Sequence, residues 1–264
     1  MPVLRFELRR QLPSFLGTSA LVAALLVALL VGLWPVFRDA QADVSAILAS
    51  YPPEFLEAFG AGGDVLSFTG FLTFIALYFE LGAAIAGFGW GLATFGLERR
   101  DRCSDFLLAM PLARSSVFAQ KLGCCLAGVI VLTLASVVAA TATARLSDID
   151  ADAARLALAT AGLGGVALVF MAAGSLAGTL APRVRSVSAW ATCAGVAGFV
   201  LGVLPELTGE DKLKALSPFS WFAPSGAMDN GSFDVGYLAA AGALALVLLA
   251  AAYVVYTRSD AHAE

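Results

Sequence analysis

Histidine is very scarce in this chain of 264 residues. Its one histidine, His262, lies near the C-terminal end. A His-based metal cage or a buried Ser-His or Cys-His dyad therefore cannot form within one chain. This excludes a zinc enzyme and an intramembrane protease of the Ser-His kind, and the sequence predicts no catalytic, cofactor-binding or metal-binding residue.

Charge is also scarce. Charged residues make up 14% of the chain and hydrophobic residues 59%, whereas soluble domains carry about 25% charged residues. Too little polar surface exists to cover a globule in water, so the solvent must largely be lipid. The net charge of -4 argues against a nucleic-acid partner, which a basic excess would favour. The four cysteines show no C-x-x-C spacing and are interpreted as reduced packing residues.

Long apolar runs fill most of the chain. About 20 helical residues cross the hydrocarbon core of a membrane, and backbone groups in lipid must bond within the segment. The fold class predicted from these runs is an all-α polytopic membrane protein, a six-helix bundle in one domain covering residues 1–264. The six predicted spans are residues 15–37, 67–96, 117–144, 156–180, 186–207 and 235–256.

The first run imitates a signal peptide, because three arginines precede it and Ala40-Gln41-Ala42 follows it. It is longer than the 7 to 15 residues typical of a signal-peptide core, so we expect an uncleaved first helix. Basic residues then set the orientation. Eleven of the sixteen lysines and arginines fall on the side that holds both termini. The sequence therefore predicts a multi-pass protein of the cell membrane with both termini in the cytoplasm.

Small residues and one acid stand out inside the spans. Glycines recur four residues apart at Gly87 and Gly91, at 174 and 178, and at 198 and 202, a spacing that lets helix backbones approach closely. Packing within one chain is favoured over a dimer seam. Glu80 is the one acid deep in a predicted span, and it needs a partner, a proton or water there. A structural or cavity-lining role for Glu80 is favoured over ion coupling.

The connection over residues 97–116 is the most informative segment. Its charges come first, and then Cys103, Phe106, Leu107 and Met110 follow at helical spacing before Pro111. This pattern predicts a short amphipathic helix on the cytoplasmic membrane face, after which Lys121 reaches the interface from the third span. A purely topological role would explain the arginines alone, whereas a partner-binding helix also explains the apolar turn. The chain has no G-x-x-x-x-G-K-[ST] loop, so nucleotide chemistry belongs to another polypeptide.

The same segment resembles a known family. Residues 98–122, with Asp105-Phe106-Leu107-Leu108-Ala109-Met110-Pro111 at their centre, are similar to the first cytoplasmic loop of ABC-2 type permeases, including six-span permeases of the nitrous-oxide reductase maturation group. Leu216-Ser217-Pro218-Phe219-Ser220-Trp221-Phe222 resembles the aromatic segment before their last span. The chain departs from the family at Arg102-Cys103-Ser104, where Gly-Thr-Leu is usual.

The resemblance implies a permease subunit of an ATP-binding-cassette transporter, most simply an exporter. It would pair with a second permease copy or relative, with membrane lipid around it, and with cytosolic ATPases that carry ATP and Mg. Residues 3–12 would form an interfacial helix. The loop would dock on the ATPase, with contacts from Glu98, Arg99, Arg102, Asp105, Phe106, Leu107, Met110 and Pro111.

The external segment over residues 206–234 has two interpretations. It re-enters the outer leaflet and lines an exit route, or it forms an aromatic interfacial belt. Phe219 and Trp221 are therefore candidates, with Glu80, for the transport pathway or for a structural role. The rival functions are a membrane scaffold that transports nothing and, less favoured, a membrane-embedded enzyme.

Overall fold

The computed structural model describes residues 2–48, 50–52, 56, 67–100, 113–147, 149, 151–181, 184–208 and 217–258. In these ranges six helices are long and apolar enough to cross a membrane. The predicted fold class, an all-α six-span membrane bundle, is confirmed. The coupling helix predicted between the second and third spans falls on residues outside these ranges.

The helices are longer than most of the predicted spans, because their ends continue past the apolar runs. The first span is α1 (Pro2–Ala28), continued by a π-helical turn, η1 (Leu29–Leu33), and by α2 (Trp34–Asp39); α3 (Gln41–Leu48) follows it. The other spans are α5 (Phe68–Arg100), α7 (Arg114–Leu146), α8 (Ala153–Leu180), α9 (Val187–Thr208) and α13 (Val235–Arg258). Two short helices, α11 (Pro218–Trp221) and α12 (Pro224–Asn230), lie between α9 and α13.

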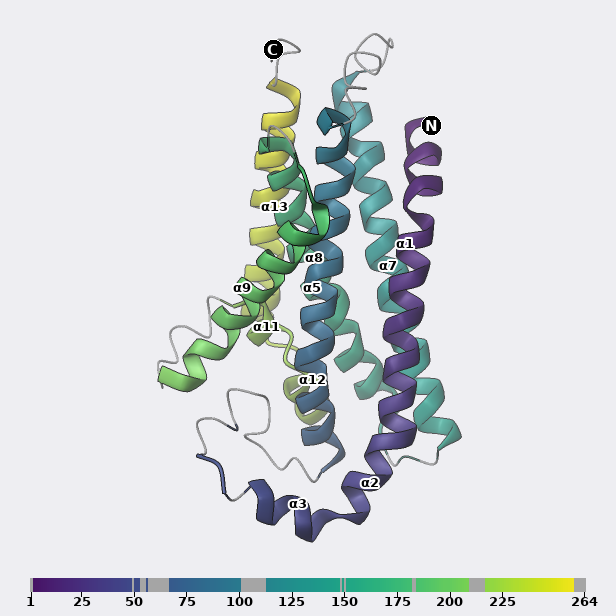
Figure 1. Ribbon diagram of the computed structural model, residues 1–264, viewed down its shortest axis with the longest axis vertical. Helices are drawn as coiled ribbons and strands as arrows, with labels where there is room; N and C mark the ends of the chain where they lie inside the picture. The colour runs from purple at the N-terminus through teal and green to yellow at the C-terminus, as the bar shows by residue number, and fades with distance from the viewer. Residues whose placement is uncertain are drawn as a thin grey trace.

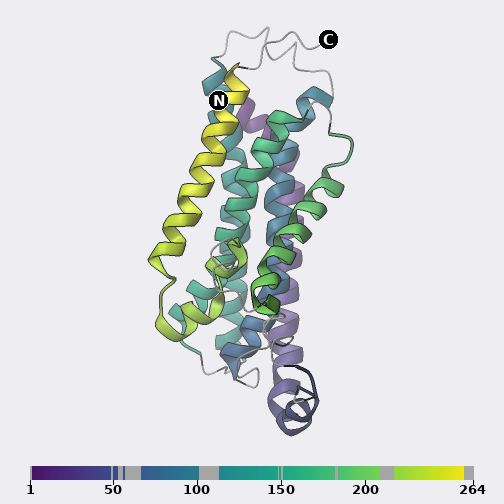
Figure 2. The same ribbon diagram turned by 90° about the vertical axis from the view of Figure 1, so that its left-hand side faces the viewer.

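Five long helices run along one axis, and α9 leaves the bundle at an angle (Figure 1). The start of α1, the ends of α5 and α13 and the start of α7 all lie at one end, which we call the loop end. The start of α8 and the end of α7 lie at the opposite, far end. In Figure 2, α13 and α9 flank the bundle on opposite sides, where α13 packs on α8 and α9 packs on α5.

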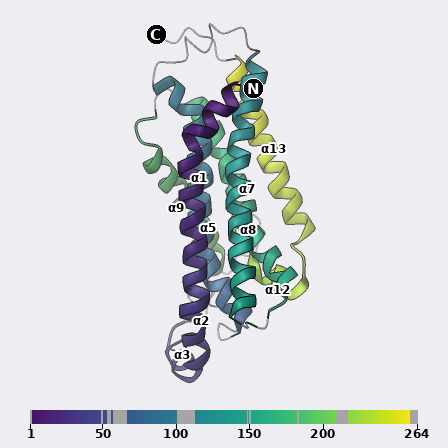
Figure 3. The same ribbon diagram turned by 90° about the vertical axis from the view of Figure 1, so that its right-hand side faces the viewer.

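The first helix does not break where the sequence suggests. Residues 3–12 continue directly into α1 instead of forming a separate interfacial helix, which corrects the expectation taken from the family resemblance. The reason is a buried face at helical spacing, which packs beside α7 along its length (Figure 3). The buried positions of this face are Val3, Glu7, Gln11, Phe15, Ser19, Val22, Leu26 and Leu30.

The π-helical turn η1 precedes Pro35, the second residue of α2. A proline inside a helix lacks an N–H donor, and its ring crowds the carbonyl group of the preceding turn. One wider turn relieves this crowding without ending the helix. The first span therefore continues to Asp39 in spite of the proline.

The tightest contact in the bundle is the seam between α5 and α8. A Cβ atom on Gly87 would overlap the carbonyl oxygen of Ala167, and one on Gly174 would overlap that of Phe88. A Cβ atom on Gly91 would likewise overlap the carbonyl oxygen of Met171. The two backbones touch because these positions carry no side chain. The interpretation of the glycine pairs as packing within one chain is confirmed here.

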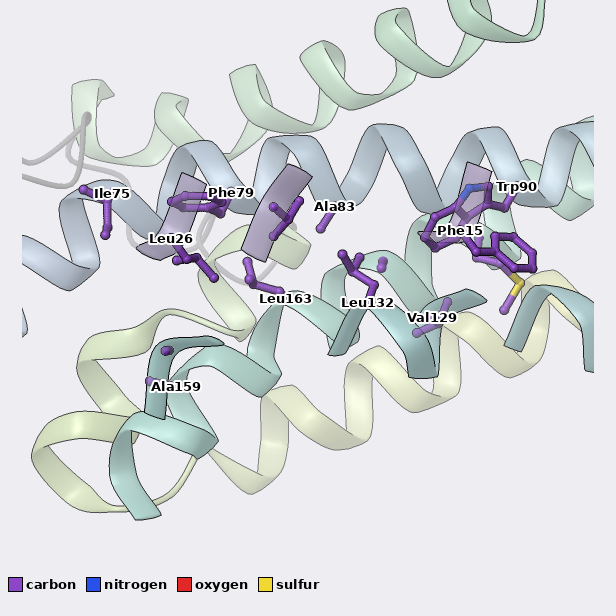
Figure 4. Packing of buried hydrophobic residues seen from close by; sticks show 14 of the residues in the cluster. Phe15, Leu26, Ile75, Phe79, Ala83, Trp90, Val129, Leu132, Ala159 and Leu163 are labelled. Carbon is purple, nitrogen blue, oxygen red and sulfur yellow. The ribbon is translucent and has the colours of Figure 1, made fainter. Parts of the chain in front are cut away.

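On the other side of α5, large side chains fill the space toward α1 and α7. The rings of Phe15 and Trp90 meet edge to face with centroids 5.0 Å apart, and the Phe15 ring occupies the gap left by Gly128. Figure 4 shows this layer continuing through Leu132 and Leu163. The core therefore lies on both faces of α5, which is the central helix.

Candidate functional site

A buried polar cluster lies at the loop end, between α1, α5 and α7, and is centred on Thr94. The Thr94 hydroxyl donates to the carbonyl of Trp90 at 2.8 Å and accepts a hydrogen bond from Gln11. The thiol of Cys125 also donates to it, at 3.2 Å. Lys121 Nζ donates to the Thr94 carbonyl oxygen at 2.8 Å. The last turns of α5 are thereby joined to both neighbouring helices.

Lys121 is fully buried, with an exposed fraction of 0%. The sequence suggested that this side chain extends to the membrane interface, and that expectation is wrong. The ammonium group lies 5.4 Å from the ring centroid of Phe95 and 5.7 Å from that of Tyr256. Aromatic faces and a carbonyl oxygen stabilise the cation inside the bundle, so it does not need to reach water.

The first turns of α1 add a charged pair to this cluster. Glu7 is 1% exposed and pairs with Arg10 at 2.8 Å. The indole N–H of Trp90 donates to the hydroxyl of Ser14 at 3.1 Å, and the backbone N–H of Leu4 donates to the side-chain oxygen of Gln120 at 3.3 Å. These bonds hold the start of α1 against α5 and α7.

The last helix is joined to the same end. Arg114, the first residue of α7, donates to the carbonyl oxygen of Thr257 at 3.0 Å. The ring of Phe118 contacts the rings of Tyr253 and Tyr256 on α13. The segment that leads out of the loop is therefore fixed to the C-terminal helix as well as to α5.

The coupling residues predicted from the sequence lie largely outside the described residues. Glu98 and Arg99 belong to the last turn of α5, and their side chains are outside the description. The remaining predicted residues, Arg102, Asp105, Phe106, Leu107, Met110 and Pro111, lie outside it altogether. The structure instead places the two residues from which this loop departs and returns, Arg100 and Arg114, at the loop end (Figure 1).

The polar cluster was not foreseen from the sequence, although one signal was available. Glu7 and Gln11 occupy the four-residue spacing that runs from Val3 to Phe15, so two polar residues share the stripe of a buried helix face. Polar residues on such a face must find partners. Thr94 carries no comparable signal, because a lone threonine in an apolar helix commonly bonds to its own backbone.

The chain between α9 and α13 turns back into the bundle. Phe222 packs its ring on Gly165 and its carbonyl oxygen near Gly162, and Gly165 lies near the middle of α8. This finding favours the interpretation of residues 217–233 as re-entering the bundle over that of an interfacial aromatic belt. Glycines on α8 make the space for this segment.

Phe219 and Trp221 are both buried in that segment. The ring of Phe219 lies between Phe170 of α8 and Phe199 of α9, with centroids 5.8 and 6.3 Å away. Gly198 and Gly202 of α9 open the gap that receives Phe219. The structure therefore brings Phe219 and Trp221 together at the junction of three helices.

One arginine fixes the re-entrant segment at the far end. The guanidinium of Arg155, in the first turn of α8, donates to the carbonyl oxygens of Met228 at 2.8 Å and Asp229 at 3.1 Å. These carbonyls belong to the last turn of α12, which ends at Asn230 and is followed by the capping residue Gly231 with φ +68°. A cation at a helix C-terminus satisfies carbonyl groups that have no partner within the helix.

Glu80 lies in the middle of the bundle, on α5, and is 3% exposed. Among the described residues Glu80 has no hydrogen bond or ion pair. Close by, Ala76, Phe79, Thr160 and Pro224 border a cavity of about 10 Å³, which is near the size of one water molecule. Glu80 is next to Phe79 in the chain and does not itself line this cavity.

A larger cavity of about 230 Å³ opens beside the π-helical turn, where Trp34, Phe68 and Arg38 are among the lining residues. It lies at the far end, since Ser147 also lines it. Drug-sized ligands occupy cavities of about 300 to 1,000 Å³. Neither of these two cavities reaches that volume.

Six helices long and apolar enough to cross a membrane make the chain a polytopic membrane protein. The chain matches a family described as the C-terminal domain of the multidrug efflux system permease Rv1217c, over residues 9–257. The chain belongs to this family, which confirms the predicted function of an export permease. No curated protein and no solved structure matches it.

Proposed function

We propose that the chain is the membrane subunit of an ATP-binding-cassette exporter of the ABC-2 type. Two such permeases, identical or related, assemble with two cytosolic ATPases, and these bind ATP and Mg. The family to which the chain belongs supports the proposal, as does the absence of a phosphate-binding loop from its sequence. The observation that carries it is a group of buried hydrogen bonds between the helices that flank the loop over residues 97–116. Lys121 of α7 donates to Thr94 of α5, and Gln11 of α1 donates to Thr94 as well. We call these three residues the clamp.

This clamp gives the loop a mechanical connection to the bundle. Thr94 lies six residues before the end of α5 and Lys121 seven residues after the start of α7, and they are bonded to each other. Closure of the ATPases pushes on the loop, and the bond between these residues makes α5 and α7 move together. Gln11 of α1 is hydrogen-bonded to Thr94, so α1 follows the same displacement.

The loop end is the cytoplasmic end in this proposal, and the protein lies in the cell membrane. Eleven of its sixteen lysines and arginines belong to this side of the predicted topology, and short basic loops are not readily translocated. The start of α1 and the end of α13 share that side with the loop, so both termini are cytoplasmic.

The substrate route in this proposal runs beside α5. It is lined by Glu80 from α5 and by Phe219 and Trp221 from the re-entrant segment. Phe170 of α8 closes it on the other side. The apolar lining fits amphiphilic compounds of diverse structure, in accord with the multidrug description of the family. Export requires the re-entrant segment to move away from α8, because the described cavities near it are too small for a drug.

The proposal is tested by co-purification of the ATPase with the full chain. Leu107→Asp places a charge where the loop is proposed to dock, and we expect it to abolish ATPase association. The matched control is Leu146→Asp at the far end, where Leu146 is 87% exposed, and this variant should retain the ATPase. Equal retention by both variants would refute the docking role and the proposed orientation. Association without ATP-dependent export would instead identify a scaffold.

A further inference from the structure

Two acidic side chains are deeply buried in the described part of the chain, and they differ in whether they have a polar or charged partner. Glu7 is paired with Arg10 at 2.8 Å. Glu80 is 3% exposed and has neither a cation nor a hydrogen-bond donor among the described residues. Buried carboxyl groups are normally satisfied. A buried acid without a partner at membrane depth points to a ligand or a transport role.

The packing of the helices shows what surrounds Glu80. Gly87 of α5 touches Ala167 of α8, and both helices run from the far end toward the loop end. Two turns earlier on each helix stand Glu80 and Thr160. The hydroxyl of Thr160 donates to the carbonyls of its own helix, at 2.8 Å to Leu156. It is therefore already used within α8.

A small apolar cavity lies at this level of the bundle, and Glu80 is not among its lining residues. Phe79, Leu163 and Pro224 border the small cavity at this level of the bundle, together with Ala76 and Thr160. Pro224 begins α12 of the re-entrant segment. When this segment moves away from α8, the carboxyl group faces a space lined by aromatic and aliphatic groups. Such a space repels anions through Glu80 and dehydrates small hydrophilic cations at high cost.

One class of ligand fits both properties. A lipophilic cation, such as a quaternary phosphonium or a protonated aromatic amine, spreads its charge over apolar groups and is weakly hydrated. It gives Glu80 the opposite charge that the bundle does not supply, and its rings fill the apolar space. We propose that Glu80 is the anionic group of a binding site for lipophilic cations, formed between α5, α8 and α12. This inference rests on the proposed export function and names its substrate class.

The experiment measures binding and export separately. Radiolabelled tetraphenylphosphonium is the probe for binding to the purified full-length chain. The same cation and the neutral dye Nile red are the probes for export from cells that contain the chain and its ATPase. The variants are Glu80→Gln and Glu80→Asp. The control is Ser136→Ala, which removes another buried polar group, one that bonds only to its own helix at 2.9 Å in the structure.

We expect Glu80→Gln to weaken tetraphenylphosphonium binding by about 30-fold or more, as for removal of one partner of a buried charge pair. Glu80→Asp keeps the charge and should retain most of the affinity. Ser136→Ala should bind like the parent chain. Export of Nile red by Glu80→Gln should fall less than export of tetraphenylphosphonium, because a neutral compound does not need the carboxylate. The midpoint of thermal unfolding of Glu80→Gln should equal or exceed that of the parent chain.

Three results would overturn the inference. They are no tetraphenylphosphonium binding by the parent chain, unchanged binding by Glu80→Gln, and a Glu80→Gln variant that loses the export of both compounds and unfolds at a lower temperature. The last result would assign Glu80 a structural role. Binding that depends on Glu80 without any export from cells would leave the site standing and refute the proposed export function.

Discussion

The seam between α5 and α8 offers the sharpest test of the packing, through Gly87→Ala. A Cβ atom there would overlap the carbonyl oxygen of Ala167 and would lie 2.9 and 3.0 Å from its carbonyl carbon and Cα atoms. These neighbours are backbone atoms of a helix and cannot rotate away. The two helices must therefore separate locally by on the order of 1 Å, and such a gap forfeits a quarter to a half of each dispersion contact it opens.

Overpacking of this kind costs about 1 to 3 kcal/mol. For a chain of this size each kcal/mol lowers the unfolding midpoint by about 2 to 4 °C. We expect Gly87→Ala to unfold about 2 to 12 °C below the parent chain, as measured by far-UV circular dichroism in detergent. The control is Gly82→Ala on the same helix, where a Cβ atom meets nothing within 4 Å.

Alanine is the better helix former, so Gly82→Ala should unfold at the same temperature as the parent or above it. The comparison removes the effect of helix propensity, since both variants make the same chemical change on α5. Equal unfolding temperatures for the two variants would refute the close contact of α5 with α8.

Two further variants address the ends of the bundle. Lys121→Met removes a charged hydrogen bond to Thr94, which is worth about 1.5 to 3 kcal/mol. It also removes the cost of burying the ammonium group, so we expect the variant to unfold at nearly the same temperature as the parent chain. The amount of substrate exported per ATP hydrolysed should fall greatly. Parental export by this variant would contradict the role of the clamp. Arg155→Met removes the bonds to the end of α12 and should speed amide hydrogen exchange over residues 224–230 by about tenfold, equivalent to about 1.4 kcal/mol. Unchanged exchange, measured by mass spectrometry, would show that Arg155 does not hold α12.

The membrane helices could be predicted because lipid leaves the backbone few choices. An apolar run of sufficient length must be a helix, and every predicted span corresponds to a long helix of the structure. The ends of the helices were harder to predict than the spans themselves. The family resemblance implied an interfacial helix over residues 3–12, yet inside the bundle Glu7 pairs with Arg10 and Gln11 donates to Thr94. Hydropathy does not register such pairing.

Some residues of the candidate sites could be predicted from the sequence and others could not. Glu80 could be selected from the sequence because an acid in an apolar run is conspicuous. That Lys121 is buried could not be predicted, because its partners include a backbone carbonyl and two rings from other helices. The same holds for the re-entrant position of Phe219, which depends on gaps left by Gly198 and Gly202. Long-range contacts of this kind have no signature in a single sequence.

The order of the helices along the chain bears on how the protein is made. The partner of α5 is α8, and α7 is synthesised between them. When α5 enters the membrane, its glycine face and Glu80 therefore meet lipid or the insertion machinery, at a cost of about 2.5 to 3.5 kcal/mol for a charged group at mid-depth. The glycine face of the central helix is covered only after the fourth span has been inserted, so a nascent chain that stops after α7 leaves this face without its partner.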